Sequence, residues 1–420
     1  GLVPALDAAR PDRHEALKDS ARGSAGPERR RFRRALVVTE VALSLVLLAG
    51  AGLLIKSFYR LQQVDPGFDP ARLLGVTIYL PDHRYPQNEH QAAFYAALLE
   101  RVRALPGVTS AGAVTTLPFS PVGVDHDMPV SVDGRPQPEG RIPEADFRIT
   151  SPGYFETMAI PVVRGRTFDE NDRADAPLVA VVNQEFARTL LAGEDPIGTR
   201  IRYGHRGPPI EIVGLVGQVR HRGLDAEPRP ELYVPYRQLQ YGTMTLVVRA
   251  AGDPLTLAEP VKRAVYAVDP AQPVTAVATM AELMQASAAT RRFHMVLFAG
   301  FAALALGLAA VGLYGVISYA VTQRGREIGI RLALGAAPRD VFRVVLGDGV
   351  RLAAAGVVIG LVGAVALTRL LATLLFSVSP TDPLVLATVA AALVAVAGLA
   401  CALPARRATR VDPVVALRTE

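Results

Sequence analysis

Residues 293–321 read FHMVLFAGFAALALGLAAVGLYGVISYAV, an apolar run without Asp, Glu, Lys or Arg. A helix of about 20 such residues crosses the roughly 30 Å hydrocarbon core of a bilayer. Three further runs have a similar length, at residues 35–56, 350–375 and 384–403. One such run could be the buried core helix of a soluble protein, but four runs predict a membrane protein with four transmembrane helices.

Basic residues gather on one side of these predicted helices. They are Arg10, Arg13, Lys18, Arg22, Arg29, Arg30, Arg31, Arg33 and Arg34 before the first helix, Arg324, Arg326, Arg331, Arg339 and Arg343 after the second, and Arg406, Arg407, Arg410 and Arg418 in the tail. Loops rich in Lys and Arg stay in the cytoplasm, so both termini and the segment 322–343 are expected there. The net charge of +6 follows from this bias and requires no nucleic-acid partner.

Residues 57–292 are then expected outside the cytoplasm as an α+β domain inserted between helices 1 and 2. Alternating and helical patterns predict β-α-β parts at about 70–120 and 240–290, around a β-rich subdomain at about 125–238. The remaining divisions are a cytoplasmic basic segment at 1–34 and a permease domain at 293–420.

The predicted outer domain carries little recognisable chemistry. No G-x-S-x-G nucleophile elbow occurs, and Asp125, His126 and Asp127 are more typical of a solvated turn than of a metal site. No Walker A sequence exists, so any ATP must be bound by another polypeptide or domain. We therefore expect neither an enzyme nor a bound cofactor or metal in this chain.

The stretch Q323RGREIGIRLALGA336 follows the second predicted helix and has the spacing of a short amphipathic helix. Ile328, Leu332, Ala333 and Leu334 are expected on an apolar side. Arg324, Glu327 and Arg331 are expected on the opposite side, with Gly335 ending the helix. The residues alone leave open whether such a helix lies on lipid or against a protein.

The segment from Ser318 to Ala336, followed by R339DVF342, resembles the FtsX-like permease domain of MacB-type ABC transporters. The motifs G153YFETM158, R164GRTF168, V182NQEF186 and E194DPIG198 are similar, in the same order, to the MacB-like periplasmic core domain. The resemblance implies a permease subunit of the bacterial inner membrane that contacts an ATPase subunit, which binds ATP and Mg. The implied interface residues are Arg324, Arg326, Glu327, Ile328, Gly329, Arg331, Leu334 and Gly335.

The resemblance also implies mechanotransmission, in which closure of the ATPase moves the helices and the outer domain during export. Membrane-fusion or outer-membrane proteins are further candidate partners. Two alternatives stay open at this point: a non-transporting regulator of an envelope enzyme or sensor, and a membrane-anchored extracytoplasmic enzyme.

Residues 4–18 align without gaps on residues 404–418, with seven identities. Chance similarity between basic tails is one explanation. Duplication is the other, and it predicts that residues 1–20 are the tail of a preceding repeat and that this chain is the C-terminal half of a duplicated permease. The missing half, or another copy, would then be a second permease partner.

Three features are expected inside the membrane. Gly356, Gly360 and Gly363 predict close helix packing along one face of the third helix. Glu40 should face protein or reach the inner interface, because a charge in lipid is costly. Asp348 and Arg351 are expected to satisfy each other.

Overall fold

The computed structural model describes residues 27–121, 126–135, 143–204, 207–239, 241–334 and 337–409. These residues belong to two compact units. We call residues 61–290 the sheet domain, and the described residues of 27–60 and 291–409 the helix unit. The predicted terminal repeat lies largely outside the described residues, since residues 1–26 and 410–420 are not among them.

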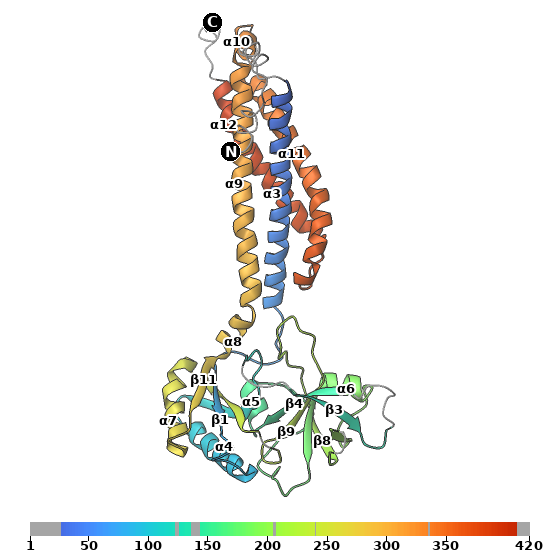
Figure 1. Ribbon diagram of the computed structural model, residues 1–420, viewed down its shortest axis with the longest axis vertical. Helices are drawn as coiled ribbons and strands as arrows, with labels where there is room; N and C mark the ends of the chain where they lie inside the picture. The colour runs from blue at the N-terminus through green and yellow to red at the C-terminus, as the bar shows by residue number, and fades with distance from the viewer. Residues whose placement is uncertain are drawn as a thin grey trace, which may run out of the picture. The chain divides into compact units, whose positions relative to one another are not determined.

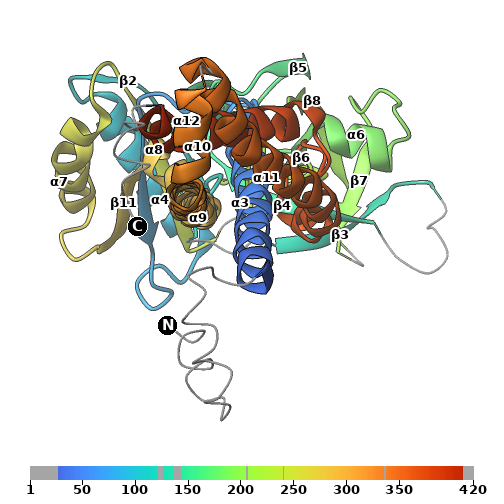
Figure 2. The same cartoon turned by 90° about the horizontal axis from the view of Figure 1, so that it is seen from above.

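The helix unit contains the four predicted apolar helices, which lie beside one another (Figures 1 and 2). They are α3 (Pro27–Gln62), α9 (Ala289–Gln323), α11 (Pro338–Leu367), which continues as the 3-10 helix η2 (Thr368–Leu374), and α12 (Pro383–Ala408). The short helix α10 (Gly325–Ala333) separates α9 from α11. The chain thus has four helices long and apolar enough to cross a membrane in its described part.

Helix α11 begins at Pro338 instead of at the predicted residue 350. Proline suits the first turn of a helix, because the amide hydrogen that it lacks has no partner there. Val341 and Gly349 are both buried, which continues the helical packing pattern ahead of the apolar run. The segment between α9 and α11 is therefore shorter than the predicted range 322–343.

The core of the helix unit is narrow and contains small residues. Val41 and Leu45 of α3 pack with Leu313 of α9, Ala353 of α11 and Cys401 of α12. Large apolar side chains such as those of Leu304, Val311 and Val362 point outward instead. An apolar exterior around a small-residue core is typical of helices that pack together in lipid.

The sheet domain begins and ends with two interleaved β-α-β units. Strands β1 (Leu73–Tyr79) and β2 (Val108–Val114) flank helix α4 (Asn88–Arg103). Strands β10 (Thr243–Ala250) and β11 (Val274–Thr279) flank the 3-10 helix η1 (Pro254–Leu257) and α7 (Ala258–Val268). The strand order β11-β1-β10-β2 is antiparallel throughout, which is the ferredoxin-like split β-α-β arrangement. These four strands and the helices α4 and α7 lie within residues 70–120 and 240–290.

The inserted residues form the remaining strands of the same sheet. These are β3 (His126–Val132), β4 (Glu144–Thr150), β5 (Val162–Gly165), β6 (Val179–Asn183), β7 (Arg200–Tyr203), β8 (Ile210–Val216) and β9 (Glu231–Pro235). The pairing of Val114 with Thr150 joins them to β2, so the described strands belong to one continuous sheet. The insertion also contains α5 (Tyr154–Met158) and α6 (Gln184–Leu190), and α8 (Met280–Ser287) follows β11.

Helices cover both faces of the ferredoxin-like part. Helices α4 and α7 lie side by side (Figure 2), and their Leu98 and Val265 pack on Val76 of β1. On the other face, Phe155 of α5 packs with Val247 of β10. Because both faces are buried, almost the whole of β1 is apolar.

Candidate functional site

Helix α10 contains most of the predicted interface residues. Glu327 and Arg331 are four residues apart and form an ion pair of 2.6 Å between Oε1 and Nη2, with both side chains about half exposed. Such pairs stabilise a short helix and leave its polar surface in solvent. The predicted amphipathic helix is therefore present, and it ends at Ala333.

The apolar side of α10 packs on this chain's own helices. Ile328 is only 6% exposed and clusters with Val341 of α11 and Ala408 of α12. Gly329 is also buried. Ile328 thus packs α10 against the helix unit, and Gly329 is buried beside it.

Arg324, just before α10, is tied to α11. Its Nη1 donates a hydrogen bond of 3.2 Å to Oδ2 of Asp348. The predicted partner of Asp348, Arg351, lies 3.8 Å away and has an almost fully exposed side chain. The expected pair of Asp348 and Arg351 is therefore a weak contact. The hydrogen bond from Arg324 to Asp348 instead links the start of α10 to α11 across 24 residues of sequence.

Leu334 was predicted on the same side as Ile328, but it is 83% exposed. Six residues at about 100° each place Leu334 about 120° from Ile328 by the shorter way around the helix, so the two side chains point to different faces. Ile330, which sequence reasoning missed, is 43% exposed on this outward side. The side chain of Arg326 and all of Gly335 lie outside the described residues.

We call Glu327, Ile330, Arg331 and Leu334 the α10 surface. By helical geometry these four residues cover an arc of roughly 100°, whose centre lies roughly 110° around the helix from the buried Ile328. The surface combines a paired acid and base with two exposed apolar side chains. Apolar groups among satisfied charges are typical of protein interaction sites.

The third apolar helix crosses α3 at its glycines. A Cβ at Gly356 would lie 2.6 Å from Cγ1 of Val41, and one at Gly360 would lie 2.9 Å from the backbone oxygen of Ala42. At Gly363 the corresponding distance is 3.4 Å, an ordinary contact with Val46. The backbones of α3 and α11 therefore approach most closely at Gly356 and Gly360.

Glu40 of α3 faces protein. Its carboxylate lies against Gly312 of α9, where an added Cβ would clash with Oε2. One turn further on, the Ser44 hydroxyl donates a 2.9 Å hydrogen bond to the backbone oxygen of Ala305. These contacts join α3 to α9 through polar groups.

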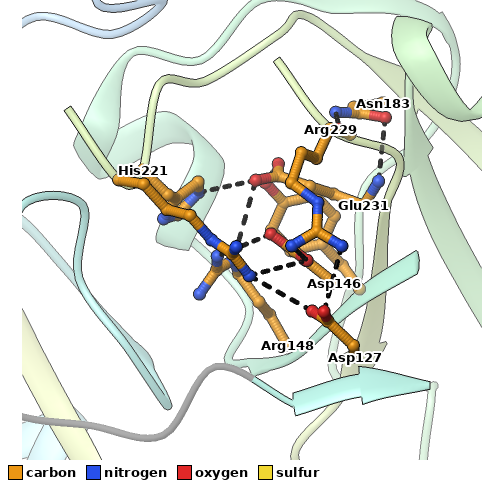
Figure 3. Close-up of polar contacts among 9 residues, drawn as sticks. Asp127, Asp146, Arg148, Asn183, His221, Arg229 and Glu231 are labelled. Carbon is orange, nitrogen blue, oxygen red and sulfur yellow. Dashed lines mark hydrogen bonds and ion pairs between the residues drawn. The ribbon is translucent and has the colours of Figure 1, made fainter. Parts of the chain in front are cut away.

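A buried polar cluster lies in the sheet domain and was not predicted (Figure 3). Parallel pairing of β4 with β9 sets Asp146 opposite Glu231. The Arg148 side chain, only 1% exposed, lies 3.7 Å from a carboxylate oxygen of each. Nε2 of His221 lies 3.1 Å from Oε1 of Glu231. Charged groups this deeply buried persist only when they are paired.

Two aspartates at the edge of this cluster share arginine partners. Asp127 lies 3.0 Å from Arg229 and 3.2 Å from Arg222, and Asp146 contacts both arginines at slightly longer range. Burial and a hydrogen bond with Asp127 raise the pKa of Asp146 to about 6. Partial burial alone would raise the pKa of Asp127, but the hydrogen bonds of Asp146 and Arg229 outweigh it and lower the pKa. Burial and nearby arginines hold the pKa of His221 well below its usual value.

The cluster has the geometry of a structural anchor. Oδ1 of Asn183 accepts hydrogen bonds from the backbone nitrogens of Phe186 and Glu231, which joins β6 to β9. Asp127 lies on strand β3 and not in the predicted solvated turn, whereas Asp125 is outside the described residues. Within the described ranges, no group of three or more His, Cys, Asp or Glu is arranged to hold a metal ion.

Comparison with known families agrees with the resemblance of the motifs. The MacB-like periplasmic core domain matches residues 36–286, and the FtsX-like permease C-terminal domain matches residues 299–413. The chain belongs to the MacB/FtsX family of ABC transporter permeases. A permease of this family is an inner-membrane protein with a periplasmic domain, and the match to the periplasmic core covers residues 61–286 of the sheet domain.

Curated relatives of this MacB/FtsX-type permease include proteins named pyoverdine export ATP-binding/permease protein PvdT. That of Pseudomonas syringae pv. syringae is 28% identical over 62% of this chain and 40% of its own length. That of Pseudomonas putida is 27% identical over 74% of this chain and 49% of its own length. The chain thus spans half or less of the length of these relatives.

Solved structures similar to the permease include the periplasmic region of MacB from Actinobacillus actinomycetemcomitans. It is 12% identical, with a TM-score of 0.36, and the match covers 52% of this chain and 94% of that one.

Proposed function

We propose that this permease couples ATP hydrolysis by a partner ATP-binding module to movement of its periplasmic domain, in an export-type ABC transporter. The observation that carries the proposal is the arrangement of helix α10. Its α10 surface is exposed, and its Ile328 packs against α11 and α12. The curated relatives are named as ATP-binding/permease proteins, which supports a close association between such a module and a permease. The module is either a separate subunit or another domain.

Two contacts would transmit a displacement of α10 to the other helices of the helix unit. One is the apolar contact of Ile328 with Val341, and the other is the hydrogen bond from Arg324 to Asp348. Both end on α11, which in turn contacts α3 at Gly356 and Gly360. Close packing resists compression, so displacement of α10 passes to α3. Helices α3 and α9 precede and follow the sheet domain in the sequence, and they complete the proposed path.

The proposed orientation has both termini and α10 in the cytoplasm. The basic residues on this side, including Arg339 and Arg343 of α11, support it. A second permease half, a missing repeat or another copy, completes the proposed transporter. The relatives' names include pyoverdine export, and we propose export of a compound of that kind for this chain.

The coupling proposal is tested by co-purification of the ATP-binding partner with full-length variants. E327A/R331A and I330S/L334S each remove part of the α10 surface without changing the buried Ile328. We expect both to lower partner association at least about tenfold, since central interface residues carry most of the binding energy. V344S is the matched control, because Val344 is an exposed apolar residue of α11 outside this surface.

Normal partner association and normal ATP turnover in both double variants would overturn the assignment of this surface. Loss of association in V344S as well would indicate a general defect of the helix unit. Thermal stability of each purified variant separates the two explanations.

A further inference from the structure

A pocket of about 110 Å³ opens between α3, α9 and α11, near the start of α10. Arg33 and Arg34 come from α3, Arg324 from between α9 and α10, and Asp348 from α11. Three positive side chains against one carboxylate leave a net charge of two positive units. An anionic group is the chemical class that such a pocket favours.

Two of the arginines have no charged partner in the part of the chain that the structure describes. Among the described residues, Arg33 and Arg34 make no hydrogen bond or ion pair, although the Arg33 guanidinium stacks 4.5 Å from the centre of the Tyr319 ring. Stacking orients a guanidinium and leaves its edge free to donate hydrogen bonds. Arg324, in contrast, already bonds Asp348. Arg33 and Arg34 are therefore the available ligands for an anion.

The pocket wall also has an apolar part, next to the polar side chain of Gln323. Val316 and Ile317 of α9 and Leu352 of α11 line it beside the arginines. All three belong to helices long and apolar enough to cross the bilayer. A free anion would gain nothing from such a wall, whereas a lipid offers a phosphate to the arginines and a glycerol and acyl chain to the apolar side.

We propose that this pocket binds the phosphodiester headgroup of an anionic phospholipid, through Arg33 and Arg34. A volume of about 110 Å³ is several times the roughly 10–15 Å³ that a single water needs, so a phosphate group fits. Basic pockets between membrane helices are suited to such headgroups. The bound lipid would hold α3, α9 and α11 together beside Asp348, the residue that anchors α10. The site does not depend on the proposed ATP coupling, because lipid binding requires no ATP-binding partner.

The test titrates the purified full chain, in neutral detergent, with a fluorescent short-chain phosphatidylglycerol. We expect R33Q/R34Q to weaken binding at least about tenfold, since each arginine near an anionic lipid contributes a several-fold factor. R33K/R34K keeps the charge and should recover most of the affinity, which excludes misfolding as the cause. R343Q is the matched control, because Arg343 is an exposed arginine of α11 that does not line the pocket.

Two further probes distinguish the sources of the phosphate. Short-chain phosphatidylcholine should bind much more weakly than phosphatidylglycerol, and inorganic phosphate should bind more weakly still because it lacks the acyl chain. Equal affinity for phosphatidylcholine, or equal affinity for inorganic phosphate, would overturn the proposal. So would equal loss of binding in R343Q and R33Q/R34Q.

Discussion

Arg324 donates a hydrogen bond to Asp348 and thereby fastens the start of α10 to α11. Both side chains are partly exposed, so the bond contributes at most about 1 kcal/mol to stability. Its role in the proposed coupling is positional: it limits how far α10 can move without α11.

The substitution D348N removes the charge from this bond. We expect amide hydrogens of residues 325–333 to exchange up to about five-fold faster, since about 1 kcal/mol of bracing is lost. Hydrogen exchange followed by mass spectrometry measures this change. R351Q is the control and should leave exchange unchanged, because Arg351 lies 3.8 Å from Asp348 and is nearly fully exposed.

Ile328 and Ile330 should respond in opposite ways to truncation. I328A removes a buried contact with Val341 and should destabilise the attachment of α10 by about 2 kcal/mol or more. I330A removes an exposed side chain and should leave stability unchanged within about 0.5 kcal/mol. Thermal unfolding of the purified chain, together with exchange in α10, measures both. Equal destabilisation by the two variants would contradict the orientation of the helix.

Alanine at the glycines of α11 should separate close contacts from open positions. G356A and G360A should destabilise the helix unit by about 1–3 kcal/mol, because the added methyl meets Val41 or the backbone of Ala42. G347A should be neutral or slightly stabilising, since nothing lies within 4 Å of its Cβ. Melting temperatures in detergent report the differences. A tolerated G360A would show that α3 and α11 do not pack as described.

Arg148 balances two buried carboxylates, those of Asp146 and Glu231. R148L should cost about 3–5 kcal/mol of sheet-domain stability, because it removes a charged partner from each of two buried carboxylates. R202L is the matched control: Arg202 pairs with Asp133 at 3.1 Å near the surface, so its loss should cost no more than about 1 kcal/mol. Denaturant unfolding of residues 61–290 would compare the two variants, and similar costs would refute a special role for Arg148.

The raised pKa of Asp146 predicts a pH dependence that D146N should abolish. The folded carboxyl binds its proton more tightly than the unfolded one, whose pKa is near 3.8. Its contribution to stability is therefore fully present below about pH 3.8 and is lost as the pH rises through about 6. The free energy of unfolding of wild type relative to D146N should rise as the pH is lowered from 6 to 4.

Comparing the free energies of unfolding of wild type and D146N separates the effect of Asp146 from that of His221. The folded pKa of His221 is depressed, so its contribution is lost as the pH falls below about 6.5, and it is the same in both proteins. The contribution of Asp127 to stability changes only below about pH 3.8, because its folded pKa is lowered from that value. A difference between wild type and D146N that does not change with pH would refute the raised pKa.

Local patterns in the sequence predicted what depends on neighbours along the chain. The four apolar helices, the β-α-β parts and the amphipathic α10 follow from periodicity and composition. The polar cluster could not be predicted in this way. In strand β4, the residues Asp146, Arg148 and Thr150 alternate with apolar ones, a pattern that ordinarily indicates a solvent-facing side, yet all three are buried.

The sequence by itself determined that this chain crosses a membrane, carries a periplasmic sheet domain and belongs to the MacB/FtsX family, because hydrophobic length and motifs are local properties. Only the tertiary structure decided which side of α10 is free, which arginine Asp348 binds, and that Arg148 lies among carboxylates. Each of these depends on groups far apart in the chain that meet only after helices and strands pack. Packing therefore leaves the α10 surface exposed and places Arg33, Arg34 and Arg324 around one pocket.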